Sequence, residues 1–228
     1  MNPRRRPDPD PRRLVAGLHA RGKLPHLKRE GVAYFITFRL ADSLPRAALE
    51  RLKQEREAIV QQARAANRPL AWHEEQQLFL WYSERVEAFL DAGAGECWLR
   101  RPDIANLLAG AINFFTDERY DLRAWVVMPN HVHVVFRPHP DHTVSEIEHS
   151  WKSFTANEAN RLLNRVGEHF WQKESYDHWI RDDAERARLC AYVTDNPVKA
   201  RLCSQPTDWP WSSAHPLTDR FRHKGTSR

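Results

Sequence analysis

Cysteine is scarce in this chain of 228 residues. The three cysteines, Cys97, Cys190 and Cys203, are widely spaced and form no Cys-x-x-Cys pair. An odd number of separated thiols predicts neither a disulfide framework nor a cysteine-based zinc site. We therefore expect a protein of a reducing compartment, the cytoplasm.

Long hydrophobic runs are also missing. The N-terminal segment lacks the apolar core of a secretory signal, and no apolar run has the length needed to cross a bilayer. We therefore expect neither a signal peptide nor a membrane partner. No internal repeat is visible, which argues against a repeat architecture.

The composition predicts one domain, or one domain with a large insertion. Hydrophobic residues make up 41% of the chain and include nine Trp and ten Phe, which suffice for a core. The formal net charge of +5 favours an anionic partner, with nucleic acid as the first candidate. A basic soluble protein without such a partner has the same composition, because Asp and Glu are also plentiful.

The segment Trp125–Phe136 carries the clearest chemical signal. After the turn residues Pro129 and Asn130, His131 and His133 are one residue apart in an apolar run that is typical of a strand. Side chains alternate across a strand, so both imidazoles project from one face. Such a pair supplies two ligands for a divalent metal, but histidines in the core or on the surface show the same spacing.

The remaining pattern predicts an α+β fold, with helices packed on an antiparallel sheet. Apolar residues on both faces of the first strand indicate that it is central. Residues 46–95 form a helical insertion, which either packs on the sheet or holds DNA. The expected elements are strand 32–40, helices 46–66, 72–91 and 103–115, strands 122–128 and 131–137, helix 144–166, a short strand at 176–181, and a helix from Asp182 or Asp183 to Asn196, before Pro197.

Tyr192 and Asn196 share one face of the last predicted helix, because they are four residues apart. Tyrosine serves as a covalent nucleophile in some enzymes, and an amide oxygen is a hard ligand suited to Mg²⁺ or Mn²⁺. Two neutral imidazoles and one amide carry no charge, so a phosphate would have to complete such a site. The alternatives are a core tyrosine and an asparagine that ends a helix.

The histidine segment resembles the metal motif of single-tyrosine HUH transposases, and further stretches resemble the branch called REP-associated tyrosine transposases. These stretches occur in the expected order and cover roughly residues 21–214. They are Arg21–His26, Phe35–Pro45, Gly95–Leu99, Ser150–Thr155 and Tyr192–Leu202.

The resemblance implies a ferredoxin-like or RRM-like HUH fold over residues 21–214, with a mobile basic tail at 1–20 and a basic C-terminal tail at 215–228. It implies that His131, His133 and Asn196 hold Mg²⁺ or Mn²⁺. Tyr192 would attack the scissile phosphate and form a 5′-phosphotyrosine. The implied substrate is single-stranded DNA at palindromic hairpins, bound by a monomer or a homodimer.

Tyr176 is the rival nucleophile, but no ligand-type residue accompanies it at helical spacing. Trp151 is a candidate for base stacking, although a tryptophan on a helix face is more often core. Candidates for DNA contact flank the site in the same motifs, because basic groups supply affinity for the backbone. They are Arg39, Lys152, Arg181, Lys199 and His178, the last of which has a structural role as its alternative.

Two other functions compete with strand transfer. A catalytically silent descendant would bind palindromic DNA as a regulator. A zinc-dependent hydrolase would activate water at the histidine pair, but it would need an acidic general base, and the chain has no His-Glu-x-x-His pattern.

Overall fold

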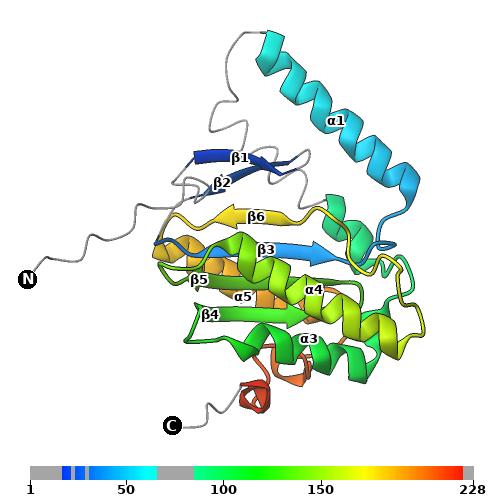
Figure 1. The fold of residues 1–228 in the computed structure, drawn as a ribbon, viewed down its shortest axis with the longest axis vertical. Helices are drawn as coiled ribbons and strands as arrows, with labels where there is room; N and C mark the ends of the chain where they lie inside the picture. Colours follow the sequence, from blue (N-terminus) through cyan, green and yellow to red (C-terminus); the bar gives the residue numbers. More distant parts are fainter. Residues whose placement is uncertain (1–16, 22–23, 29–30, 66–84, 223–228) are drawn as a thin grey trace, which may run out of the picture.

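A computed structural model describes residues 17–21, 24–28, 31–65 and 85–222 (Figure 1). The first sixteen residues, which make up most of the predicted N-terminal tail, lie outside this part. The elements are β1 (Gly17–Arg21), β2 (Leu24–Lys28), β3 (Tyr34–Arg39), α1 (Arg46–Ala65), η1 (Trp98–Arg100), α3 (Pro102–Phe114), β4 (Tyr120–Val127), β5 (His131–Pro138), α4 (Val144–Leu162), β6 (Tyr176–Trp179), α5 (Asp183–Lys199), η2 (Pro206–Asp208) and η3 (Thr218–Phe221).

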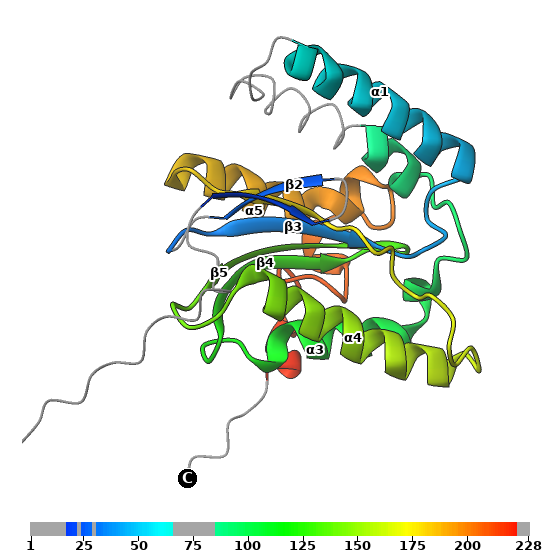
Figure 2. The same cartoon turned by 45° about the horizontal axis from the view of Figure 1, so that its top comes forward.

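The main sheet has four antiparallel strands in the order β4-β5-β3-β6. β3 is therefore a central strand, as predicted, and β4 and β5 form the predicted hairpin around Pro129 and Asn130. Helices α3 and α4 cover one face of the sheet and α5 covers the other (Figure 2). This arrangement confirms the predicted α+β class with an antiparallel sheet.

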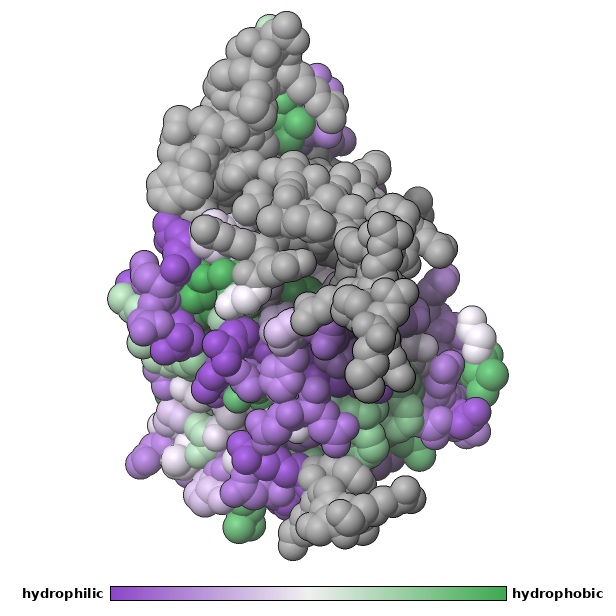
Figure 3. Space-filling view, turned by 60° about the vertical axis from the view of Figure 1, so that its left-hand side comes forward, coloured by the Kyte–Doolittle hydropathy of each residue, from purple (hydrophilic) through white to green (hydrophobic). Residues whose placement is uncertain are grey.

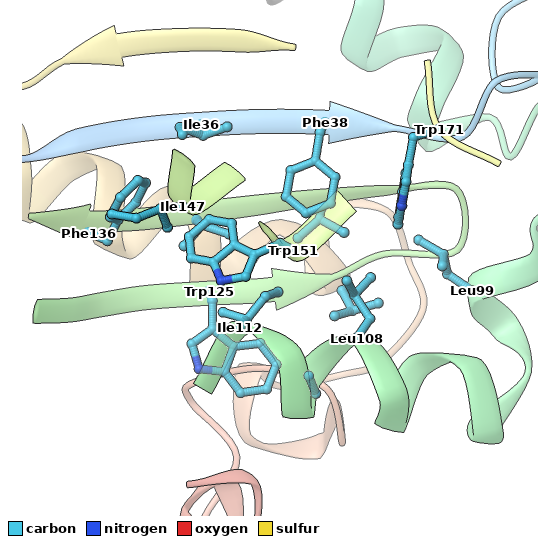
Figure 4. Packing of buried hydrophobic residues seen from close by; sticks show 14 of the residues in the cluster. Ile36, Phe38, Leu99, Leu108, Ile112, Trp125, Phe136, Ile147, Trp151 and Trp171 are labelled. Atoms are coloured by element: carbon cyan, nitrogen blue, oxygen red, sulfur yellow. The ribbon is translucent and has the colours of Figure 1, made fainter. Parts of the chain in front are cut away.

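The larger core lies between the sheet and the helices α3 and α4 (Figure 4). Ile36 and Phe38 enter it from β3, and Trp151 of α4 packs with a ring-centroid distance of 6.5 Å to Phe38. The indole Nε1 of Trp151 donates a hydrogen bond of 3.1 Å to the hydroxyl of Tyr120. Trp151 is thus a buried core residue with a satisfied N–H, and the base-stacking role is excluded by its 2% exposure.

Helix α5 packs on the opposite face, against β4 and β5. Asp182 caps it, as predicted, by accepting a hydrogen bond of 2.7 Å from the backbone N–H of Glu185. The predicted end at Asn196 is wrong, because α5 continues through Pro197 to Lys199. The backbone N–H of Ala200 reaches the carbonyl of Asn196 at 2.9 Å, so the last turn stays hydrogen-bonded although Pro197 has no donor of its own.

Three other boundaries and contacts differ from expectation. β1 begins at Gly17, before residue 21, where we expected the domain to start. Pro102 occupies the first turn of α3 and Arg101 its N-cap position, so the helix starts before Asp103. Phe154, predicted on the core side of α4, has 51% of its surface exposed.

The helical insertion is described in two pieces. α1 stands away from the four-stranded sheet in Figures 1 and 2. A second helix over residues 85–91 packs closely, with Val86 and Leu90 buried, and ends at Gly93, whose φ is +70°. The expectation that the insertion packs on the body therefore holds for residues 85–91, whereas the start of that helix lies outside the described residues.

The segment that follows α5 covers the edge of β4. The backbone N–H of Val127 donates to the carbonyl of Trp211, and the N–H of Ser213 donates to that of Trp125, both at 2.9 Å. The segment thus pairs with the edge strand and satisfies its backbone groups. Residues 218–221, in the predicted C-terminal tail, form η3, and Phe221 packs on Trp125.

Hydrophilic residues predominate over the coloured atoms of the face in Figure 3. Within the described ranges, no helix has the length and apolarity that a membrane span requires.

Candidate metal and tyrosine site

The two histidines of β5 are fully buried, and each is held by a neighbour at Nδ1. Asn130 Oδ1 lies 2.8 Å from Nδ1 of His131, and Thr37 Oγ1 lies 2.7 Å from Nδ1 of His133. The two Nε2 atoms face each other at 3.1 Å. Asn130 Oδ1 only accepts hydrogen bonds, so His131 carries its proton on Nδ1 and presents a free lone pair at Nε2.

Burial keeps both imidazoles neutral. It is the largest cause that lowers the pKa of His131 and of His133, and the positive charge of Lys199 lowers the pKa of both further. Neutral imidazole is the form that binds a metal ion.

Helix α5 brings Tyr192 and Asn196 to the same place. The rings of Tyr192 and His133 have centroids 5.5 Å apart, and Asn196 Nδ2 donates a hydrogen bond of 3.1 Å to the Tyr192 hydroxyl. Tyr192 and Asn196 therefore share one helix face, as predicted, and the structure places the Tyr192 ring against His133 on the histidine face of the sheet.

The side-chain oxygen of Asn196 has no hydrogen-bond partner. Its side chain is 1% exposed, and its Oδ1 atom is buried without any hydrogen-bond partner. A buried acceptor without a donor costs about 1–3 kcal/mol, so such an atom calls for a ligand. An amide oxygen suits a hard divalent cation, and this atom together with two Nε2 atoms fits Mg²⁺ or Mn²⁺.

Carboxylates and thiols do not assemble a competing centre in the described residues. No group of three or more His, Cys, Asp or Glu side chains there is placed to hold a metal ion.

Sequence reasoning missed three side chains that surround this site. Thr37 and Asn130 orient the histidines, and Glu87, from the insertion, accepts a hydrogen bond from the Tyr192 hydroxyl through Oε1. Asn130 could have been suspected from its place next to His131. No sequence signal marks Thr37 or Glu87, because each meets its partner only through the tertiary fold.

Tyr176 lies close to the site without joining it. It starts β6, directly opposite Thr37 in the strand register. With Thr37, Arg39 and Glu87 it lines one cavity. Tyr192 is the tyrosine whose hydroxyl is hydrogen-bonded to Asn196 and whose ring lies against His133, which favours it over Tyr176.

Two of the predicted DNA contacts hold the protein together instead. Arg39 is 5% exposed, and its guanidinium donates to Ser43 Oγ at 3.1 Å. Lys152 Nζ donates to the carbonyl of Gln172 and to Ser175 Oγ, both at 2.9 Å, and pairs with Glu148. The expectation that these two side chains present their charges to DNA is not supported, because both are engaged inside the chain.

His178 and Arg181 contact the buried carboxylate of Glu185, with His178 itself buried and Arg181 at the surface. Arg181 contacts both carboxylate oxygens of Glu185, and His178 Nε2 lies 3.1 Å from Oε1. Burial opposes the charge of Glu185, but the hydrogen bonds from Arg181 and His178 outweigh it and lower its pKa to about 2. This geometry favours the structural role of His178.

We expect Glu185→Gln to lower the free energy of unfolding by about 2 kcal/mol at neutral pH, because an NH2 donor replaces one of the two oxygens that accept from Arg181 and His178 and the negative charge is lost. The pKa of Glu185 is about 2 in the fold and 4.5 ordinarily, so its contribution is complete above pH 4.5 and falls as the pH drops toward 2. Urea unfolding of both proteins at pH 7 and pH 3 tests this. A stability difference that does not narrow at pH 3 would contradict it.

Lys199 is the predicted DNA contact that remains at the site. Its side chain is 53% exposed, and its Nζ lies 3.3 Å from Glu87 Oε2 and 5.5 Å from the centre of the Tyr192 ring. Among the five candidates for DNA contact, Lys199 combines a position beside the Tyr192 ring with an exposed ammonium group.

One model of a known protein family matches part of this chain. The family model described as "Transposase IS200 like" matches residues 100–196, a segment that contains both histidines, Tyr192 and Asn196. No curated protein matches the chain.

Two solved structures are similar over much of their length. "Structure of the REP associates tyrosine transposase bound to a REP hairpin" has 19% identity and a TM-score of 0.46, and covers 89% of this chain and 88% of that chain. A putative transposase from Deinococcus radiodurans R1 has 13% identity and a TM-score of 0.31, with 74% and 96% covered. The fold assignment therefore rests on the strand order and the helix placement described above.

Proposed function

We propose that this protein nicks single-stranded DNA and transfers the strand through a 5′-phosphotyrosine at Tyr192, with Mg²⁺ or Mn²⁺ as cofactor. The observation that carries the proposal is Asn196. Its Nδ2 donates a hydrogen bond to the Tyr192 hydroxyl, while its Oδ1 is buried without a hydrogen-bond partner. A nucleophile and a metal ligand are thus joined by one side chain.

The chain supplies three ligand atoms for the cofactor: Nε2 of His131, Nε2 of His133 and Oδ1 of Asn196. When bound, the ion polarises a phosphoryl oxygen and offsets the charge that develops there. Asn130 and Thr37 keep the imidazoles in the orientation that points Nε2 toward this place.

Tyr192 performs the covalent step. Its Oη bonds to phosphorus while the bond from phosphorus to the 3′-oxygen breaks, which leaves the downstream strand on the protein through its 5′-phosphate and releases the upstream 3′-end. The reverse attack by another 3′-hydroxyl rejoins strands and frees Tyr192, without ATP.

The three ligand atoms carry no formal charge, so the cation and the DNA phosphate should bind together. A phosphate oxygen supplies the negative charge that imidazole and amide lack. We therefore expect weak affinity for Mn²⁺ in the free protein and tighter binding in the presence of single-stranded DNA.

The proposed substrate is a palindromic hairpin flanked by single strand. It rests on the motifs that resemble REP-associated tyrosine transposases, among them Arg21–His26 and Ser150–Thr155. Lys199, exposed beside Tyr192, is the proposed contact to the DNA backbone. The protein would act as a monomer or a homodimer.

A labelled hairpin oligonucleotide with a single-stranded 5′ extension tests the function. Incubation with Mn²⁺, followed by a denaturing gel, should yield a nicked strand and a covalent protein–DNA band, and EDTA should remove both. Hairpin binding without either product would support the regulator instead. Cleavage without a covalent band would support a hydrolase.

A further inference from the structure

The Tyr192 hydroxyl has two partners, and together they determine where its proton lies. Asn196 Nδ2 is a donor, so the hydroxyl accepts from it. A carboxylate only accepts, so the hydroxyl proton points to Oε1 of Glu87. If the amide of Asn196 were flipped, its oxygen would contact the Tyr192 hydroxyl and its NH2 group would be the buried group without a partner.

Glu87 belongs to the helix over residues 85–91, outside the segment that matches the transposase family. Figure 2 shows this helix on the same side of the sheet as α5. Val86 and Leu90 bury the two positions that flank Glu87 on its inner side, with exposures of 4% and 2%. The position of Glu87 is therefore set by packing and not by its polar contacts alone.

The connection after this helix is tied to the histidines themselves. Asn130, whose Oδ1 holds His131, donates through Nδ2 to the carbonyl of Ala94 at 2.9 Å. Two residues on, Glu96 N–H donates to Asp42 at 2.8 Å. Gly95 lies so close to Asp42 that a Cβ there would come within 2.8 Å of its carbonyl oxygen. The segment that carries Glu87 is thus built into the site.

Lys199 completes the arrangement. Its ammonium lies 3.3 Å from the second oxygen of Glu87 and 3.7 Å from Asp91, one helical turn further on. It offsets the negative charge of Glu87 next to the path of an anionic phosphate. Asp91 shares this lysine, but within the described residues the Tyr192 hydroxyl donates to Glu87 and not to Asp91.

We infer that Glu87 is the catalytic base that takes the proton from Tyr192, an inference that rests on the function proposed above. As Oη bonds to phosphorus, its proton passes to Oε1 of Glu87. The 3′-oxygen leaves and takes one proton from water, and Glu87 returns one proton to solvent. On reversal, the protonated Glu87 gives its proton to Oη while the attacking 3′-hydroxyl loses one to water.

The need for a base follows from the acidity of phenol. An ordinary tyrosine has a pKa of about 10, so at neutral pH the weakly nucleophilic hydroxyl predominates. Transfer to a carboxylate becomes favourable only as the bond to phosphorus forms, which is the role of a general base. Removing such a group typically costs a factor of about 10²–10⁴ in rate.

The test is the rate of covalent adduct formation with the full chain, Mn²⁺ and the labelled hairpin, followed from about pH 7 to about pH 9.5, toward the pKa of phenol. Glu87→Gln should be slower by about 10²-fold at pH 7, and the deficit should shrink as the pH rises, because hydroxide replaces the base. Glu87→Asp, which keeps a carboxylate, should recover part of the rate and the pH profile of the unmodified chain. Asp91→Asn is the matched control and should stay within about fivefold, the effect of an ion pair near the surface.

Thermal unfolding and metal-free hairpin binding show whether each variant is folded. A Glu87→Gln rate equal to that of the unmodified chain would overturn the inference, as would a deficit that is the same at every pH, which indicates positioning alone. If Glu87→Gln does not fold, Glu87→Asp decides by whether it keeps the unmodified pH profile at a reduced rate. An unmodified chain that forms no adduct would overturn the proposed function together with the inference.

Discussion

Replacement of Tyr192 by Phe is expected to abolish the covalent protein–DNA adduct, with a fall of about 10⁴-fold or more in nicking. The change removes only Oη, the atom that would bond to phosphorus. It also removes the acceptor of Asn196 Nδ2 and the donor to Glu87. The ring stays in its contacts with Phe35 and His133, at centroid distances of 6.0 and 5.5 Å, so the fold should persist.

Tyr176→Phe is the matched control, because it removes the hydroxyl oxygen of the rival tyrosine, which lines a cavity together with Thr37 and Glu87. Its adduct should remain close to that of the unmodified chain. A labelled hairpin oligonucleotide with Mn²⁺, resolved on a denaturing gel for both variants, makes the comparison. If Tyr176→Phe loses the adduct and Tyr192→Phe keeps it, Tyr176 is the nucleophile.

Replacement of His133 is expected to have the second-largest effect, through loss of the cation. His133→Gln should lower Mn²⁺ affinity in the presence of DNA and reduce adduct formation by about 10³-fold, in the range reported for lost electrostatic stabilisation of a transition state. Glutamine fills most of the buried volume, whereas alanine would leave a cavity at a fully buried position. Calorimetric titration with Mn²⁺ and a hairpin oligonucleotide measures the affinity directly.

Thr37→Val tests the hydrogen bond that orients His133, without removing a proposed metal ligand. It leaves both histidines in place but removes the hydroxyl that lies 2.7 Å from Nδ1 of His133. Loss of such a supporting hydrogen bond typically costs about 10–100-fold in metal affinity. If His133→Gln binds Mn²⁺ as tightly as the unmodified chain, the histidine pair is not a metal site.

Local sequence spacing determined the residues at the centre of the site. Alternation along β5 placed His131 and His133 on one face, and helical spacing along α5 placed Tyr192 above Asn196. The same periodicities predicted both faces of β3 and most element boundaries. These features depend on neighbours within a few residues, and they could therefore be predicted from the sequence without knowledge of the fold.

The fold alone decided what surrounds that centre. Thr37 meets His133 across 96 positions of sequence, and Glu87 meets Tyr192 across 105, distances over which no periodicity operates. Tertiary packing also decided the surroundings of two residues that we predicted to contact DNA. Arg39 and Lys152 are cations in the sequence, but only packing shows that Ser43 and Ser175 engage them.

The extension of α5 past Pro197 has a similar cause. A proline disfavours helix in the residue before it, so Asn196 was a reasonable end. In the fold, Leu202 packs in the apolar cluster beneath α5, and its N–H reaches the carbonyl of Pro197 at 2.8 Å. Local spacing thus set which groups carry the chemistry, whereas tertiary packing set their partners, because burial and hydrogen bonding between distant segments override local preference.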